Sequence, residues 1–304
     1  MKETLLFTVI FPIIIDYLDD YIHSIIAQTD QRFDWLIIND GIKDYHIREK
    51  FPSNVIWKDV NENYKPAELR YLGSKYALAN NYEILIFADG DDYFTHNRIE
   101  LTKKYLMTND FVFNELYLVD ETGIELQPNV LQRIFPNSNI DSINMLLDNN
   151  IVGLSNSALN LTCIDNIYMP KEIIAVDWWL YSVLVLNGKK GELCPSAITY
   201  YRQTGNNTVG MWTPLTSIRL FKGIEVKKIH FHHLKEYAAT YMKNNAYYRI
   251  FDKKYGEMLI LEEALQRKEF CTRYTRVINN NFDQIYKGWW SEILPLEQWR
   301  QYAE

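Results

Sequence analysis

Three carboxylates follow a short apolar run in the first third of the chain. Ile84 to Ala88 is brief and rich in branched side chains, which is typical of a strand buried in a parallel sheet. Asp89, Asp91 and Asp92 come directly after it, grouped around Gly90. Carboxylates gathered at one strand end repel one another unless a cation joins them, and hard oxygen ligands suit Mg²⁺ or Mn²⁺. The alternative is a solvated turn, because Asp-Gly is a good turn sequence.

A second acid and a nearby arginine fit the same chemistry. Asp40 follows another apolar run, 33–38, and parallel strands end at one edge of the sheet, where nucleotides bind. Its carboxylate could accept hydrogen bonds from a base or a ribose. Arg70 lies in the predicted helix before the acidic strand and could donate charge-assisted bonds to a diphosphate. Taken alone, Arg70 is more often explained as an exposed arginine on a helix surface.

Asp177 stands just ahead of a predicted helix and has two interpretations. An aspartate at that position commonly caps the first turn. A carboxylate beside Trp178 and Trp179 also suits a general base next to a surface on which a sugar stacks. The residues alone leave both interpretations open.

The first part of the chain alternates between strand and helix patterns. We expect strands over 5–15, 33–38, 55–57 and 83–88, and helices over 16–28 and 66–80. This alternation predicts an α/β fold with a mostly parallel, doubly wound, Rossmann-like sheet.

After residue 94 the alternation weakens. We expect strands over 111–119 and 193–203, with Pro195 marking an edge or a bulge in the second, and helices over 141–148 and 177–187. From residue 213 onward the pattern is that of aromatic-rich amphipathic helices. We therefore divide the chain into a domain at 1–212, with halves 1–110 and 111–212, and a helical C-terminal extension at 213–304.

Charge and composition exclude several classes of protein. The 304 residues carry a net charge of −7, which argues against a general nucleic-acid binder. Residues 1–212 hold 17 Lys and Arg against 28 Asp and Glu, so the acidic charge lies in the first domain. The apolar run 5–15 is far shorter than the ~20 residues of a membrane span. Three scattered cysteines fit a reducing compartment, and we expect a cytoplasmic protein.

The motifs, taken in order, resemble those of family 2 glycosyltransferases of the GT-A fold, in the cell-surface polysaccharide and rhamnosyltransferase-like branch. The resemblance covers about residues 4 to 210. It is carried by Pro12, SIIAQT (24–29), LIINDG (36–41), Arg70 with Gly73, FADGDD (87–92), VDWWL (176–180) and YRQTGNN (201–207).

This resemblance implies a role for each candidate residue. It places the nucleotide sugar against Pro12, Asp40, Arg70, Asp89, Gly90 and Asp91. It makes Asp91 the direct ligand of Mn²⁺ or Mg²⁺, with Asp89 as the second acid, toward the ribose. Asp177 matches the catalytic base of inverting members. Because Trp178 and Trp179 adjoin this aspartate, we expect them to face the acceptor. The chain departs from the family pattern at Ile13 to Ile15, at Val176 and at Thr204.

The expected function is transfer of a sugar from a nucleotide-diphosphate donor to a hydroxyl of a saccharide or lipid-linked saccharide, with inversion. One alternative is a nucleotide- or glycan-binding protein of the same fold that has lost catalysis. Another is a sugar-nucleotide pyrophosphorylase, although FPIIIDYLDD (11–20) lacks the Gly- and Arg-rich loop that it would need. The C-terminal helices could pack on the first domain, form a homodimer, or rest peripherally on an anionic membrane.

Overall fold

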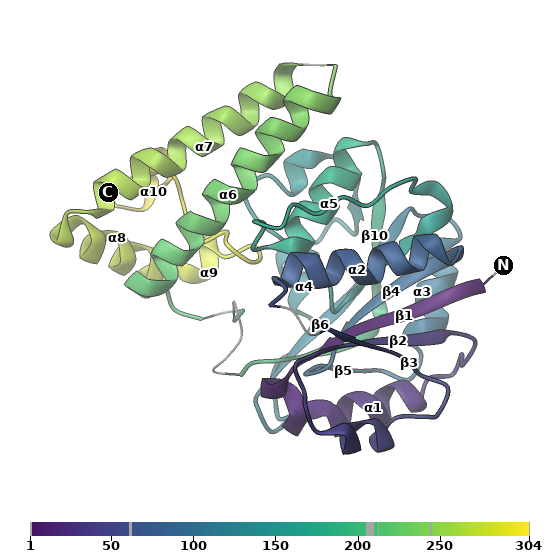
Figure 1. The fold of residues 1–304 in the computed structure, drawn as a ribbon. Helices are drawn as coiled ribbons and strands as arrows, with labels where there is room; N and C mark the ends of the chain where they lie inside the picture. Colours follow the sequence, from purple (N-terminus) through teal and green to yellow (C-terminus); the bar gives the residue numbers. More distant parts are fainter. Residues whose placement is uncertain (1, 61–62, 205–209, 212, 244, 304) are drawn as a thin grey trace.

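The computed structural model describes residues 2–60, 63–204, 210–211, 213–243 and 245–303. Its strands form a ten-stranded sheet (Figure 1). They are β1 (Lys2–Ile10), β2 (Asp34–Asp40), β3 (Ile56–Val60), β4 (Tyr82–Asp89), β5 (Tyr93–Phe94), β6 (Phe111–Val119), β7 (Glu125–Gln127), β8 (Asn139–Ile140), β9 (Ser157–Asn160) and β10 (Gly191–Arg202). The order is β3-β2-β1-β4-β9-β6-β10-β5, with β7 beside β6 and β8 beside β10.

The long strands of this sheet all run in one direction. β1 pairs in parallel with β2 and β4, β2 with β3, and β6 with β10. The short β9 is antiparallel to both β4 and β6, so β6 keeps the direction of β4. The expected mostly parallel sheet is confirmed, and β2, β4, β6 and β10 therefore end at the same edge. The inserted β9 was not predicted.

Helices cover both faces of the sheet (Figure 1). Those of the first domain are α1 (Leu18–Ile26), α2 (Pro66–Ala79), α3 (Arg98–Leu106), α4 (Val130–Ile134) and α5 (Val176–Leu186). Alternate side chains of β1 point to opposite faces. Leu6 and Ile10 join the apolar cluster of α1 and α3, whereas Leu5 and Phe7 join that of α2 and α5.

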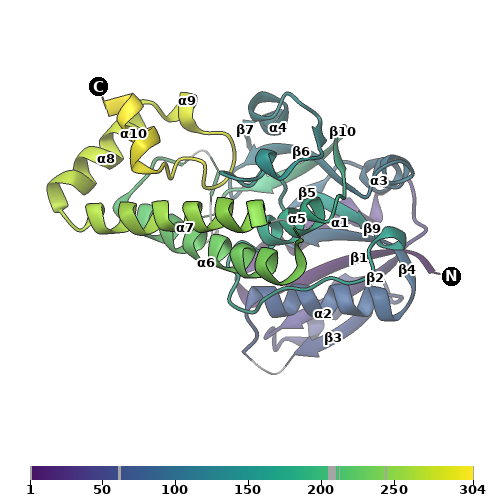
Figure 2. The ribbon, with the colours of Figure 1, turned by 90° about the horizontal axis from the view of Figure 1, so that it is seen from above.

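The C-terminal region is helical, as expected. It contains α6 (Ser217–Tyr241), α7 (Asn245–Leu265), α8 (Lys268–Asn280), α9 (Phe282–Ile285) and α10 (Leu296–Ala303). α6 and α7 lie side by side (Figures 1 and 2). Phe231 of α6 packs edge to face on Trp178 of α5, with ring centroids 5.9 Å apart, so the extension joins the apolar cluster of α2 and α5. A domain boundary at 213, a homodimer and a membrane contact stay predictions. None of the helices described here has the length and apolar character that crossing a membrane requires.

Two predicted elements differ from the structure. The first strand ends at Ile10 rather than at 15, because Pro12 begins a 3-10 helix, η1 (Pro12–Tyr17), and proline lacks the N–H that a ladder needs. The helix predicted over 141–148 is wrong. Ile140 still pairs with Gly191, and only the 3-10 turn Ile143–Met145 follows. The register of β10 shifts between Cys194 and Ile198, which confirms a bulge at Pro195.

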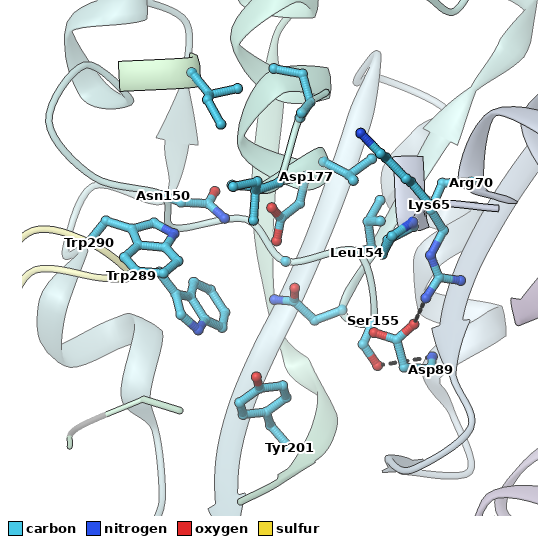
Figure 3. A pocket seen from close by; sticks show the side chains of 18 of the residues that line it. Lys65, Arg70, Asp89, Asn150, Leu154, Ser155, Asp177, Tyr201, Trp289 and Trp290 are labelled. Atoms are coloured by element: carbon cyan, nitrogen blue, oxygen red, sulfur yellow. Dashed lines mark hydrogen bonds and ion pairs between the residues drawn. The ribbon is translucent and has the colours of Figure 1, made fainter. Parts of the chain in front are cut away.

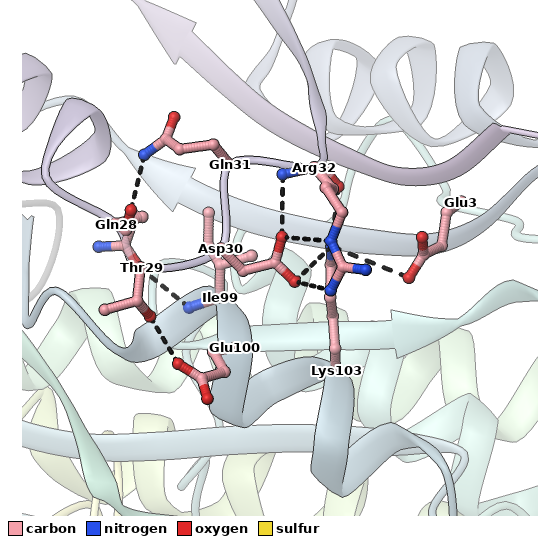
Figure 4. A network of polar contacts seen from close by, with 9 residues as sticks. All are labelled: Glu3, Gln28, Thr29, Asp30, Gln31, Arg32, Ile99, Glu100 and Lys103. Atoms are coloured by element: carbon pink, nitrogen blue, oxygen red, sulfur yellow. Dashed lines mark hydrogen bonds and ion pairs between the residues drawn. The ribbon is translucent and has the colours of Figure 1, made fainter.

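The SIIAQT segment connects the end of α1 to the start of α3 (Figure 4). The Gln28 side chain donates to the Thr95 carbonyl at 2.9 Å and accepts from the Ile99 N–H at 3.0 Å. Asp30 is held by Lys103 at 3.1 Å and by Arg32 at 2.7 Å. These interactions attach α3 to the segment that follows α1.

α3 in turn supports the end of β4. The buried Arg98 guanidinium donates to the carbonyls of Phe87 at 2.6 Å and Ser155 at 2.7 Å. The Ser155 hydroxyl accepts the Asp89 N–H at 3.3 Å. The buried hydrogen bonds of Arg98 and Ser155 therefore hold the end of β4 in place.

Candidate active site

A cavity of about 640 Å³ opens at the edge where the long strands end. Asp89, Asp91 and Asp177 all line it, although they come from β4, the turn after it and α5. Figure 3 shows Arg70 and Asp89 on one side, Trp289 and Trp290 on the other, and the Asp177 carboxyl between them. The structure thus brings together the two groups of acids that the sequence places 86 to 88 residues apart.

The acids of the β4 turn are not equivalent. Burial and the negative charge of Asp89 raise the pKa of Asp91 to about 6. Asp92 is buried outside the cavity lining and accepts the Arg202 N–H at 2.9 Å. A Cβ on Gly90 would lie 2.7 Å from Ile14 Cδ1, so the glycine lets η1 pack against the turn.

Arg202, in the YRQ motif, fastens this turn. Its Nε donates to the Asp91 carbonyl at 2.9 Å, its Nη1 to the Glu121 carbonyl at 2.7 Å and its Nη2 to Asp20 at 2.6 Å. Sequence reasoning placed Arg202 near the end of the strand expected over 193–203 and missed these hydrogen bonds. Residues 205–207 of the motif lie outside the described residues.

Two cations from α2 and its cap face the same side of the cavity. Arg70 forms an ion pair with Asp89, and its side chain is largely buried. Lys65, the residue before Pro66, is exposed and also lines the cavity (Figure 3). Together they provide positive charge beside the acidic strand end, where an anion such as a diphosphate could bind.

The carboxylates at the end of β4 are suitable ligands for a hard divalent cation. Asp89 and Asp91 offer only oxygen ligands, and Mg²⁺ sites commonly use one or two carboxylates with substrate phosphates completing the shell. Burial, and after it the charge of Asp89, raises the pKa of Asp91, and a bound cation would favour the charged form of this carboxyl. Within the described part of the chain no cluster of three or more His, Cys, Asp or Glu residues could hold a metal by itself. A metal here would need oxygen atoms from a bound ligand.

Asp177 lies in the first turn of α5, one residue after the helix begins. It is not the N-cap, which is Ala175; its Oδ1 accepts the Trp178 N–H at 2.8 Å. Burial raises the pKa of Asp177 to about 6, although the Trp178 N–H and the Asn150 side chain favour the charged form. A carboxyl that loses its proton near neutral pH can serve as a general base.

Three predicted donor-binding residues stand outside the cavity lining: Pro12, Asp40 and Gly90. Asp40 ends β2, two strands away from β4 across β1, and is half-buried, which raises the pKa of its carboxyl. Its role toward a nucleoside stays a prediction.

The assignment of Trp178 and Trp179 to the acceptor is wrong for this fold. They are 0% and 1% exposed, respectively. The Trp178 ring stacks on His230 at 3.9 Å between centroids, and each indole N–H donates to a backbone carbonyl. An acceptor cannot reach these ring faces.

Sequence reasoning also missed aromatic residues that do line the cavity. Trp289 and Trp290 reach it from the segment between α9 and α10, and Tyr201 reaches it from β10. The Tyr201 and Trp289 rings meet edge to face at 5.8 Å. The adjacent pair Trp289-Trp290 after Gly288 is the one sequence signal that could have identified this segment.

Comparisons with known sequences extend over the first part of the chain. Residues 14–145 match glycosyl transferase family 2. An uncharacterized glycosyltransferase of Rickettsia bellii is 33% identical over 111 residues, covering 35% of this chain and 16% of that protein. One from Rickettsia felis is 33% identical over 115 residues, covering 35% of this chain and 18% of that protein. The matched segments thus span less than a fifth of these relatives.

Solved structures extend the likeness to nearly the whole chain. The crystal structure of S. aureus TarS has a TM-score of 0.60 at 13% identity, covering 92% of this chain and 48% of TarS. TarS 1-349 in complex with UDP-GlcNAc has a TM-score of 0.55 at 13% identity, covering 99% and 90% of the two chains. At this identity the likeness establishes a shared fold.

Proposed function

We propose that the chain, whose residues 14–145 match glycosyl transferase family 2, transfers a sugar from a nucleoside-diphosphate donor to an acceptor hydroxyl with inversion. The observation that carries this proposal is the shared cavity of Asp89, Asp91 and Asp177. A carboxylate base and an acidic strand end then face one bound donor from two directions.

The donor occupies the side of the cavity formed by β4 and α2. Arg70 and Lys65 bind the diphosphate there through charge-assisted hydrogen bonds. The fold is shared with TarS, for which complexes with UDP-GlcNAc and with UDP exist. That likeness favours a uridine-diphosphate sugar as the donor.

Asp91 and Asp89 would hold a divalent cation, Mn²⁺ or Mg²⁺. Such an ion would supply positive charge to neutralise the leaving diphosphate. Arg70 stays paired with Asp89 and keeps that carboxylate oriented toward the same site. Arg202 holds the backbone of Asp91 in place.

Asp177 acts as the general base. Its carboxylate takes the proton of the acceptor hydroxyl while the acceptor oxygen bonds to the anomeric carbon. The bond from that carbon to the diphosphate oxygen breaks, and its electron pair leaves with the diphosphate. Because base and leaving group lie on different sides of the reacting carbon, the anomeric configuration inverts. A positioned base of this kind contributes about 10²–10⁴ in rate.

The acceptor lies on the side of the cavity formed by Trp289, Trp290 and Tyr201. Apolar pocket walls with a few placed polar groups are typical of sites for small ligands, and the C–H face of a sugar ring matches such a wall. Glu225 and Glu172 at the rim can accept hydrogen bonds from its hydroxyls. This favours a saccharide, free or lipid-linked, as in surface polysaccharide synthesis.

The test is a panel of uridine-, guanosine- and thymidine-diphosphate sugars, scored by release of the nucleoside diphosphate with a mixture of monosaccharides and disaccharides as acceptors. Each reaction is run with Mn²⁺ and with a chelator. We expect release from a uridine-diphosphate sugar that depends on the metal. A chain that binds the nucleotides but releases none would instead be a binding protein of the same fold.

A further inference from the structure

Asn149 and Asn150 are joined to the C-terminal segment just before Trp290. Asn150 N–H donates to the Trp289 carbonyl at 3.0 Å, and Trp289 N–H donates to the Asn150 carbonyl at 2.9 Å. This pair forms an antiparallel bridge. The Asn149 side chain adds a bond to the Lys287 carbonyl at 2.8 Å.

The bridge is held in one register. Gly288 has φ +126°, a conformation that favours glycine, and a Cβ there would lie 2.4 Å from the Asn150 carbonyl oxygen. The buried Lys227 of α6 donates to the carbonyls of Asp148 and Ile293, each at 2.9 Å. The extension therefore holds this segment at two points, Asp148 and Asn150.

The Asn150 side chain faces the proposed base. It is 1% exposed, and its Oδ1 accepts the Val152 N–H at 3.3 Å. The amide nitrogen then points toward the Asp177 carboxyl (Figure 3). A hydrogen-bond donor placed beside this half-buried carboxyl favours its charged form.

We infer that Asn150 is a positioning residue: held by the C-terminal bridge, it orients Asp177 and keeps its carboxyl ionisable in the apolar wall of the cavity. The inference rests on the proposed function for the role of Asp177. The placement of the amide beside the carboxyl is independent of that function.

Other groups near Asp177 act on the same carboxyl. The charge of Asp89 raises its pKa, and the buried Tyr181 lies one turn along α5. The remaining charged groups of the cavity are Lys65, Arg70, Asp91, Lys171, Glu172 and Glu225. All of these belong to other segments than the bridge, so a change of the Asn150 side chain leaves them in place.

The test is the titration of the Asp177 carboxyl by ¹³C NMR in the full chain, with the signal assigned by its loss in Asp177→Asn. In Asn150→Ala the backbone bridge remains and the amide is lost, so we expect the pKa of Asp177 to rise by about half a pH unit or more. Asn149→Ala, which removes only the bond to Lys287, is the matched control and should titrate like the wild type.

An unchanged Asp177 titration in a folded Asn150→Ala chain would overturn the inference. Gly288→Ala, which displaces Asn150 while leaving its amide intact, should shift the titration in the same direction. In the transfer assay, the acid limb of the pH profile of Asn150→Ala should move to higher pH. A shifted titration in a chain that releases no nucleoside diphosphate would keep the positioning role and reject the proposed function.

Discussion

The Arg70 guanidinium forms an ion pair with the Asp89 carboxylate at the end of β4, while its buried Nη1 has no hydrogen-bond partner among the described residues. A buried donor without a partner is costly. A bound phosphate oxygen could supply the missing acceptor. The pair therefore joins the acidic strand end to the site that we assign to the donor diphosphate.

Replacing Arg70 by Lys should weaken nucleotide binding. Lysine keeps the positive charge but lacks the planar guanidinium group, whose N–H donors can bind Asp89 and a phosphate at the same time. We therefore expect the Kd for UDP to rise about tenfold. Calorimetry with UDP measures this. Arg32→Lys is the control, because Arg32 pairs with Asp30 away from the cavity (Figure 4). Equal affinity of Arg70→Lys and wild type would remove Arg70 from the donor site.

Asp91→Asn should reduce metal binding in the presence of the nucleotide. The change removes a ligand, so the loss of Mn²⁺ affinity should exceed the roughly 10–100-fold that loss of an outer-shell partner costs. Electron paramagnetic resonance of free Mn²⁺ with UDP present reports this directly. Asp92→Asn is the comparison, since Asp92 accepts the Arg202 N–H and lies outside the cavity lining. Unchanged Mn²⁺ affinity in Asp91→Asn would refute the metal assignment.

Asp177→Asn should stabilise the protein at neutral pH. Burial raises the pKa of Asp177 from 3.8 to about 6, so in this window the folded state holds a proton that the unfolded state has released. Wild-type stability therefore falls as the pH rises from about 4 to 6 and stays lower above it. We expect the variant to gain on the order of 2 kcal/mol in the free energy of unfolding at pH 8, with the gap closing below pH 4.

Denaturant unfolding at pH 4 and pH 8 measures this gap. The exposed Asp165→Asn controls for loss of a surface carboxylate. A lower stability of Asp177→Asn than of wild type at pH 8 would mean that the charged carboxylate is well solvated in the fold.

Gly73→Ala should destabilise the helix that carries Arg70. A Cβ at Gly73 would lie 2.2 Å from the Phe7 ring of β1. Overpacking of this kind costs about 1–3 kcal/mol. Gly256→Ala in α7 meets nothing within 4 Å and should instead be neutral or stabilising by up to about 1 kcal/mol. Thermal unfolding of both variants distinguishes the two, and equal melting temperatures would contradict the packing account.

Local patterns were enough for much of the fold. The strand that ends at Asp89 is a short apolar run closed by a turn, and its neighbours follow the same rule, so the parallel sheet could be predicted from residues that interact nearby in the chain. The segment after Ile140 could not, because pairing with Gly191 some 50 residues away overrides the local helical pattern.

Long-range contacts also limited what could be predicted of the site. The helix α5 was predicted, and its tryptophans were assigned to the acceptor only because they adjoin Asp177. Asn150 has no local signature, and the Trp289-Trp290 pair does not by itself indicate a cavity, since the places of Asn150 and Trp289 depend on a bridge between segments 139 residues apart. Residues that act through long-range contacts were the ones that sequence reasoning missed.

The central claim is that Asp177 takes the acceptor proton from across the cavity that holds the donor. Its most direct test is the rate of nucleoside-diphosphate release by Asp177→Asn and wild type at pH 7.5, with Mn²⁺ and the donor selected by the panel. We expect the rate to fall by at least about 10²-fold in Asp177→Asn, with the Kd for UDP unchanged. Release at the wild-type rate would contradict it.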